Sequence, residues 1–452
     1  MIGRGYSPAY YSISLYVYYY NAHPTKIYFN SLGGFNMKKI TNIDQIELSE
    51  NTLVVMFGVP ASGKSYVAEK LAEQFDAYIA SSDAIREELF GTAECQSDPN
   101  KVFGILQHRA GEELKSGGSV IIDATALIRK YRVSNLKTYE GKFSRAILIV
   151  CATEIEIILR QNQERDRHVP EDVITRMLKT MSFPRDTEGW DEIYILPHPE
   201  NKKSLEDYLN DCKNIEHDNP HHKLGIYEHM LACEVELRAY SSKDNFLAAV
   251  GRYHDIGKPI VKSRLKRKGK EWVEDTHSHY MGHADVGAYM AACSPDPLAT
   301  EDVISLINLH MDRLGNEDHI KYVSDNYSEE FFMRYMNFIQ ADELCDEVYC
   351  PIFEILKIVK TLDLDNLEES DNEDSEFLNH VVLDPETHSR LNELCCEAFI
   401  SDRGLPRYDL MSVFYKWNNL NLEIIPGEVD NFGWLSACLV MNDGDTLVIC
   451  FG

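Results

Sequence analysis

Short apolar runs alternate with helical patterns through the first half of the chain. The runs are Leu53–Phe57, one that ends at Ala80, Ser119–Ile122, Ala146–Val150 and one that closes at Ile195. Short runs of this kind, separated by amphipathic helices, are typical of a parallel sheet with helices on both faces. The pattern predicts an α/β domain over residues 37–200.

The second half changes character. Residues 201–221 lack a long apolar period and are predicted to be a linker, and residues 222–362 have the helical period of an all-α bundle. Residues 363–376 hold eight acidic residues and no basic one, which predicts a solvated loop. Residues 377–452 are predicted to form a small C-terminal α+β segment of unknown role. Its β-like runs are Leu422–Ile425, Trp434–Val440 and Thr446–Phe451.

The first 36 residues are rich in Tyr and end just before Met37. Codons for Gly33 and Gly34 would place a purine-rich, ribosome-binding-like stretch upstream of Met37. We predict that translation starts at Met37. The alternative is a disordered or strand-forming arm.

Composition narrows the class of protein. The chain has 452 residues, 44% hydrophobic and 26% charged, which is typical of a folded protein of several domains. Its formal charge of −28 repels polyanions, so nucleic acid could bind only at a local basic cleft. The 11 cysteines form no Cys-x-x-Cys pair, and no apolar run reaches about 18 residues. We therefore expect reduced thiols, a cytoplasmic location and no membrane span.

A phosphate-binding loop follows the first apolar run. It reads Gly58-Val-Pro-Ala-Ser62-Gly63-Lys64-Ser65 and precedes a helical pattern. Backbone N–H groups of such a loop face phosphate oxygens, Lys64 can reach the β- and γ-phosphates, and the Ser65 hydroxyl can bind Mg²⁺. The sequence predicts a site for ATP and Mg²⁺.

Two carboxylates follow later strands of the predicted sheet. Asp83 can accept the proton of an attacking hydroxyl, and Arg86, one helical turn on, can hold an acceptor phosphate or orient Asp83. The alternative for Asp83 is an N-cap of the helix over Ile85–Leu89. Asp123 lies where a water-mediated Mg²⁺ contact is expected.

Several arginines follow the fourth strand, as a mobile lid over transferring phosphate requires. They are Arg160, Arg165 and Arg167. A solvated helix face is the alternative for each. Together with the motifs above, and with Val169-Pro170, Met177 and Phe183-Pro184, this stretch resembles the 5′-OH polynucleotide kinase branch of the P-loop phosphotransferases.

That resemblance covers about residues 50–197 and assigns roles. It implies that Lys64 and Ser65 bind ATP and Mg²⁺, that Asp83 is the general base and that Arg86 contacts the acceptor phosphate. It also implies that one lid arginine, such as Arg165, clamps the ATP phosphates.

Histidines and aspartates recur through the helical half at intervals of about 25 to 32 residues. They are His229, His254, Asp255, His283, His310 and Asp342. One ligand per helix and connection suits a metal site in a bundle, and mixed imidazole and carboxylate ligands suit Mn²⁺, Ni²⁺, Co²⁺, Fe²⁺ or Zn²⁺. A single buried histidine would more often be a core residue.

This order of ligands resembles the HD phosphohydrolase superfamily over about residues 222–345. The resemblance implies a primary metal site of His229, His254, Asp255 and Asp342. It implies that His283 and His310 hold a second ion or the substrate phosphate, with His277 and His279 as alternatives to His283. Lys258 has the position of the family's phosphate-contacting lysine.

The two halves together resemble bifunctional enzymes that heal broken RNA ends. Such enzymes phosphorylate a 5′-OH and remove a 3′ or 2′,3′-cyclic phosphate from RNA or DNA ends, in a phage or bacterial cytoplasm. No nucleotidyltransferase motif is present, so a separate RNA ligase is expected as a partner. The basic window Lys262–Lys270 could guide a strand, or it could be a solvated hairpin. The alternative function is a nucleoside or metabolite kinase fused to a nucleotide phosphohydrolase.

Overall fold

The structure is a computed structural model. It describes residues 36–95, 97–220, 222–240, 244–268, 271–311, 317–343 and 345, together with the strands β9, β10 and β11 near the C-terminus. The chain divides into two compact units. The larger holds Ile27–Ile215 and Tyr253–Tyr335, and the smaller holds Met1–Lys26, Glu216–Arg252 and Met336–Gly452. Except for Asn36, the predicted non-translated segment lies outside the described residues, and so does the predicted acidic loop.

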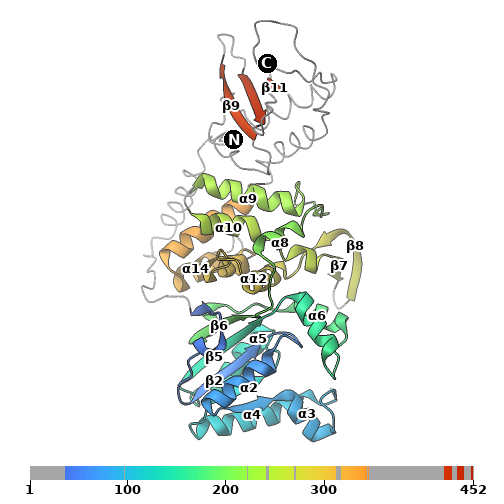
Figure 1. Cartoon of the computed structure of the whole chain (residues 1–452), viewed down its shortest axis with the longest axis vertical. Coiled ribbons are helices and arrows are strands. Elements are labelled where there is room, and N and C mark those ends of the chain that lie inside the picture. Colours follow the sequence, from blue (N-terminus) through green and yellow to red (C-terminus); the bar gives the residue numbers. More distant parts are fainter. Residues whose placement is uncertain are drawn as a thin grey trace. The chain divides into compact units, whose positions relative to one another are not determined.

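A parallel six-stranded sheet forms the centre of the larger unit, in the order β1-β6-β5-β2-β4-β3 (Figure 1). The strands are β1 (Met37–Lys39), β2 (Thr52–Phe57), β3 (Tyr78–Ser81), β4 (Val120–Asp123), β5 (Arg145–Ala152) and β6 (Glu192–Pro197). Every residue of β2 is buried, as a strand between two helical layers requires. The α/β prediction is confirmed. The edge strand β1 was not predicted, because a run of three residues is too short to show a strand pattern.

Helices connect these strands. They are α2 (Lys64–Phe75), α3 (Ser82–Phe90), α4 (Pro99–Lys115), α5 (Arg129–Tyr139), α6 (Ile155–Glu164), α7 (Glu171–Thr180) and α8 (Leu205–Asn210), with short 3-10 turns η1 (Ile43–Gln45) and η2 (Asp186–Glu188). The helix α8 lies within the predicted linker. One side of the sheet core joins Val54, Met56 and Ile121 to Val67 and Leu71 of α2. This packing fixes the start of α2 at the carboxyl end of β2.

The helical half follows. Its helices are α9 (Ile226–Tyr240), α10 (Asn245–Tyr253), α11 (Lys258–Val261), α12 (His283–Cys293), α13 (Glu301–Leu309) and α14 (Glu317–Asn326), and a further helix covers 329–343. Between α11 and α12 an antiparallel hairpin joins β7 (Ser263–Lys268) to β8 (Glu271–His279). The predicted helical region is therefore confirmed. The basic window contributes to this hairpin, and whether the hairpin guides a strand stays a prediction.

In the C-terminal segment, β9 (Leu422–Val429), β10 (Leu435–Met441) and β11 (Ile449–Cys450) form an antiparallel sheet. The predicted β-like runs there are confirmed.

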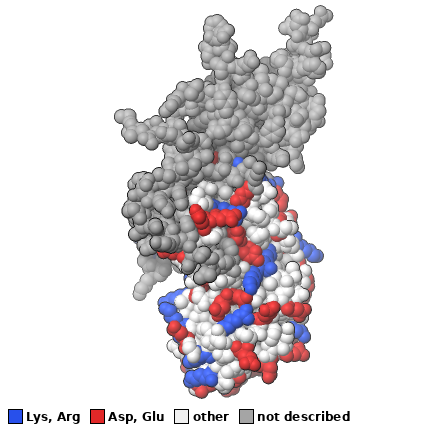
Figure 2. Space-filling model, turned by 90° about the vertical axis from the view of Figure 1, so that its left-hand side faces the viewer, with Lys and Arg blue, Asp and Glu red and all other residues white. Residues whose placement is uncertain are grey.

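Two surface features bear on partners. On the face drawn in Figure 2, acidic and basic side chains of the described residues are interspersed, so the charge of −28 is not gathered there into one acidic field. Within the described part of the chain, no helix combines the length and apolarity needed to cross a membrane.

Candidate functional site

The phosphate-binding loop joins β2 to α2. Its two glycines have positive φ angles, 155° at Gly58 and 86° at Gly63, which residues with a Cβ rarely adopt. A Cβ at Gly58 would also collide with the Ser62 side chain. The loop conformation therefore requires glycine, and it directs the unsatisfied N–H groups at the start of α2 toward the space where phosphate is expected.

Lys64 and Ser65 begin α2, as predicted. The buried Lys64 ammonium donates to the Val59 carbonyl at 2.7 Å, and burial lowers the pKa of this side chain. The Ser65 hydroxyl donates to the Asp123 carboxylate at 2.9 Å. A hydroxyl and a carboxylate from adjacent segments make an oxygen donor set that fits Mg²⁺.

Asp83 is held between two arginines. Arg86 Nη1 lies 2.8 Å from one carboxylate oxygen and Arg167 Nη1 lies 2.7 Å from the other. The N-cap alternative for Asp83 is wrong, because the Ser81 hydroxyl accepts from the N–H of Ala84 and Asp83 lies in the first turn of α3. The Asp83 side chain is 49% exposed and lines the cavity described next.

A cavity of about 1010 Å³ joins these groups. Its lining includes the phosphate-binding loop, Asp83, Arg86 and Asp123, and on the lid side Arg165 and Arg167. Arg160 does not line it and instead pairs with Glu200 at the surface, whereas Gln161 and Glu164 of the same helix line the cavity. The structure thus favours two of the three predicted lid arginines.

A second group of chemically active side chains lies in the larger unit. Asp255, His283 and His310 are buried, and each offers a ligand atom within 4.8 Å of the others. His254 Nε2 lies 3.3 Å from Asp255 Oδ2. The buried Lys258 ammonium lies 2.5 Å from the same carboxylate. Burial would raise the pKa of Asp255, but Lys258 and His254 outweigh it and hold this pKa well below the ordinary value.

The orientation of the two histidine rings fits a cation. His283 Nδ1 lies 2.6 Å from the Tyr280 carbonyl and His310 Nδ1 lies 2.7 Å from the Ile307 carbonyl, so each Nδ1 is assigned the proton. The Nε2 atoms are then electron pair donors, yet they lie 2.9 Å apart and face Asp255. Burial lowers the pKa of His283 to about 4, which keeps the ring neutral. Three electron-rich atoms converging in this way fit a divalent metal ion.

The remaining predicted ligands, His229 and Asp342, lie in the smaller unit. Their side chains are in contact, with His229 Nε2 3.0 Å from Asp342 Oδ1. Two features there were missed from the sequence. Cys345 Sγ lies 3.5 Å from His229 Nδ1, and the rings of His217 and His222 stack at 3.9 Å. Cys345 is not part of a Cys-x-x-Cys pattern, so no sequence pattern pointed to its role. His217 and His222 lie on either side of the boundary between the predicted linker and the predicted helical region.

The alternatives to His283 lie on the hairpin. His279 pairs with Asp275 at 2.9 Å, and His277 is exposed on β8. Among these three residues, His283 is the one in contact with His310 and Asp255.

Family models match both halves. Residues 53–184 match the family described as AAA domain, and residues 226–336 match the HD domain. The chain has a P-loop kinase-like domain and an HD domain.

Individual relatives match the kinase-like half. An L-seryl-tRNA(Sec) kinase from Methanococcus maripaludis is 24% identical over 168 residues, 36% of this chain and 65% of that protein. The chain thus spans somewhat less than two thirds of the length of this curated relative.

Two solved structures are similar over 32% of the chain. The gluconokinase from Sinorhizobium meliloti is 21% identical with a TM-score of 0.24, and 81% of it is covered. The sugar kinase from Janibacter is 23% identical with a TM-score of 0.25, and 83% of it is covered.

Proposed function

We propose that the kinase-like domain phosphorylates the 5′-OH of RNA or DNA ends with ATP, and that the HD domain removes a 3′ phosphate or opens a 2′,3′-cyclic phosphate. The observation that carries the proposal is Asp83 between Arg86 and Arg167 in the cavity of the phosphate-binding loop. A carboxylate beside two guanidinium groups suits an acceptor hydroxyl whose neighbour is a phosphate.

The kinase step follows from these positions. Asp83 accepts the proton of the 5′-OH while the 5′ oxygen forms a bond to the γ-phosphorus of ATP. The bond from that phosphorus to the bridging oxygen of ADP breaks. Lys64 and Arg165 offset the charge on the phosphoryl oxygens, while Arg86 and Arg167 orient Asp83 and the acceptor. Ser65 and Asp123 would hold Mg²⁺, which supplies further charge neutralisation when bound.

The hydrolase step uses the second group. His254, Asp255, His283 and His310 would hold one or two divalent metal ions, and a bound ion would lower the pKa of a water molecule that attacks phosphorus. On the resemblance of sequence, His229 and Asp342 are expected as further ligands. Lys258 places a buried ammonium beside Asp255 and would bind a phosphate oxygen of the substrate.

The hairpin favours a polynucleotide over a small molecule. Trp272 is 63% exposed and Leu265 is 48% exposed, and the strand register places both on one face of the hairpin, together with Glu274. An exposed indole suits stacking with a base of a single strand, and the exposed Arg264 and Lys268 of β7 add positive charge to the same hairpin. The curated relative, a kinase named for L-seryl-tRNA(Sec), is consistent with an acceptor carried on RNA.

Replacing Trp272 with Ala is expected to raise KM for a single-stranded RNA oligonucleotide about tenfold, because one stacked base contributes about 1–3 kcal/mol. The matched variant Trp272→Phe keeps an aromatic face and should keep KM close to that of the original protein. Steady-state phosphorylation of the oligonucleotide measures both. Equal KM values for all three proteins would exclude the hairpin as a strand-binding surface.

An RNA oligonucleotide with a 5′-OH and a 2′,3′-cyclic phosphate tests the function directly. Incubation with ATP, Mg²⁺ and Mn²⁺, Ni²⁺ or Co²⁺ should add phosphate at the 5′ end and open or remove phosphate at the 3′ end. Mass spectrometry of both ends measures the two reactions. Unchanged ends with every metal, and turnover of nucleosides or sugars instead, would support the small-molecule pair. In the end-healing case a separate ligase would seal the products in the cytoplasm.

A further inference from the structure

Helix α12 lies between the kinase-like half and the metal group of the larger unit. Residues 283 and 287 point to one side of this helix, and residues 285 and 289 point to the opposite side. On the first side, Gly257 packs against the helix backbone. A Cβ added to Gly257 would lie 2.6 Å from the backbone nitrogen of Gly287. One helix therefore separates the two groups of functional residues.

The opposite side of α12 is bonded to residues that back the phosphate-binding loop. The Asp285 carboxylate accepts from the Phe183 N–H at 2.7 Å, and the Phe183 ring packs edge-on against Phe57. The Tyr289 hydroxyl lies between the N–H and the carbonyl of Thr153, at 3.1 and 2.9 Å. Two anchors four residues apart fix both the rotation and the axial position of α12.

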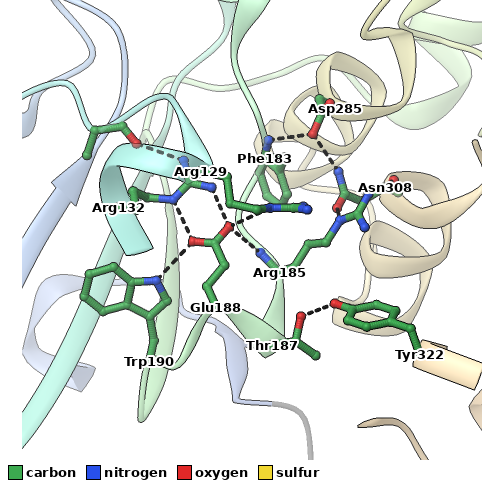
Figure 3. Close-up of polar contacts among 11 residues, drawn as sticks. Arg129, Arg132, Phe183, Arg185, Thr187, Glu188, Trp190, Asp285, Asn308 and Tyr322 are labelled. Carbon is green, nitrogen blue, oxygen red and sulfur yellow. Dashed lines mark hydrogen bonds and ion pairs between the residues drawn. The ribbon is translucent and has the colours of Figure 1, made fainter. Parts of the chain in front are cut away.

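A side-chain network extends this anchoring to α13 (Figure 3). Asn308 Nδ2 donates to the Asp285 carboxylate at 3.0 Å, and Arg185 Nε donates to Asn308 Oδ1 at 3.0 Å. Asp285 lies two residues after His283, and Asn308 lies two residues before His310. The bond between Asp285 and Asn308 thus ties the two histidine-bearing helix ends together.

The kinase-like side of this network is itself rigid. The Arg185 N–H donates to Glu188 at 3.3 Å. Glu188 also accepts two bonds from the fully buried Arg132, at 2.7 and 2.5 Å, and one from Trp190 at 3.2 Å (Figure 3). Buried ionic networks with this many partners hold one geometry. Arg185 therefore presents its guanidinium to Asn308 from a fixed position.

We propose that Asp285, Asn308 and Arg185 are positioning residues for the His283–His310 pair, so that the kinase-like half completes the hydrolase site. The inference rests on the proposed function of the HD domain. It predicts that these residues set the metal affinity of the pair although none of them belongs to the group of possible ligands.

The positioning role is tested by titrating the metal-free, full-length protein with Mn²⁺. Electron paramagnetic resonance measures the free ion at each step, and the bound Mn²⁺ is obtained by difference. His310→Ala first identifies the Mn²⁺ that depends on the pair. Asp285→Ala and Arg185→Ala are expected to weaken binding of that same Mn²⁺ by about 10- to 100-fold, as loss of a supporting hydrogen bond does. Phosphorylation of the 5′-OH should persist in both variants, which shows that they fold.

Two variants serve as controls. Asp285→Asn keeps an oxygen that accepts from Phe183 and Asn308, and should bind Mn²⁺ nearly as tightly as the original protein. Arg334→Ala removes an arginine that pairs with Asp302 at the other end of α13, and should leave the Mn²⁺ affinity unchanged.

Three outcomes would overturn the positioning role. Arg185→Ala and Asp285→Ala could bind Mn²⁺ as the original protein does, Asp285→Asn could be as weak as Asp285→Ala, or Arg334→Ala could be equally weak. Failure of the proposed function itself is distinguishable, because the original protein would then bind no Mn²⁺ through His310 and release no phosphate.

Discussion

Replacing Asp83 with Asn is expected to lower the turnover number for 5′-OH phosphorylation by about 10³-fold, in the range that removal of a general base produces. The amide keeps the size of the side chain but cannot accept the proton of the hydroxyl. It also removes the negative charge that Arg86 and Arg167 share. Transfer of radiolabelled γ-phosphate from ATP to a 5′-OH RNA measures the loss.

A matched variant on the same helix separates this effect from a change in helix α3. Glu88→Gln removes a carboxylate that pairs with Arg109 outside the cavity, and should leave phosphorylation intact. Release of 3′ phosphate should be unchanged in both variants. Full phosphorylation by Asp83→Asn would exclude Asp83 as the base.

Local chemistry made much of the kinase-like domain predictable. The phosphate-binding loop depends on its glycines, on the strand before it and on the helix after it. All of these are close together in the sequence, so residues 53–65 were enough to predict the loop. The spacing of Asp83 and Arg86 by one helical turn likewise predicts their contact. Interactions of this range require no knowledge of the tertiary fold.

Contacts between distant segments were not predictable. Arg167 meets Asp83 only because the lid folds back over the carboxyl edge of the sheet, and nothing in the spacing distinguishes it from Arg160. Asp285 and Asn308 look like solvated positions on their helices until the kinase-like half packs against them. The sequence alone therefore gives the candidate side chains for a site. Which of them come into contact depends on the tertiary fold.

Replacing Asp255 with Asn is expected to lower phosphate release from a 3′-phosphorylated RNA by about 10³-fold, because loss of a charged ligand weakens metal-activated attack. The amide would also deprive the buried Lys258 ammonium of its negative partner at 2.5 Å, and breaking such a buried pair costs about 3–5 kcal/mol of stability. Metal-dependent release of inorganic phosphate and thermal unfolding measure the two effects separately.

The kinase reaction shows whether the hydrolase loss is local. Because the phosphate-binding loop and Asp83 keep their own contacts, Asp255→Asn should still phosphorylate 5′-OH ends. Asp302 lies on α13 and pairs with Arg334. Asp302→Asn weakens this pair and should keep both activities. Loss of both reactions in Asp255→Asn, with the protein folded, would contradict two separate active sites. Loss of phosphate release alone, together with loss of phosphorylation alone in Asp83→Asn, would establish that one chain performs the two reactions at different groups of residues.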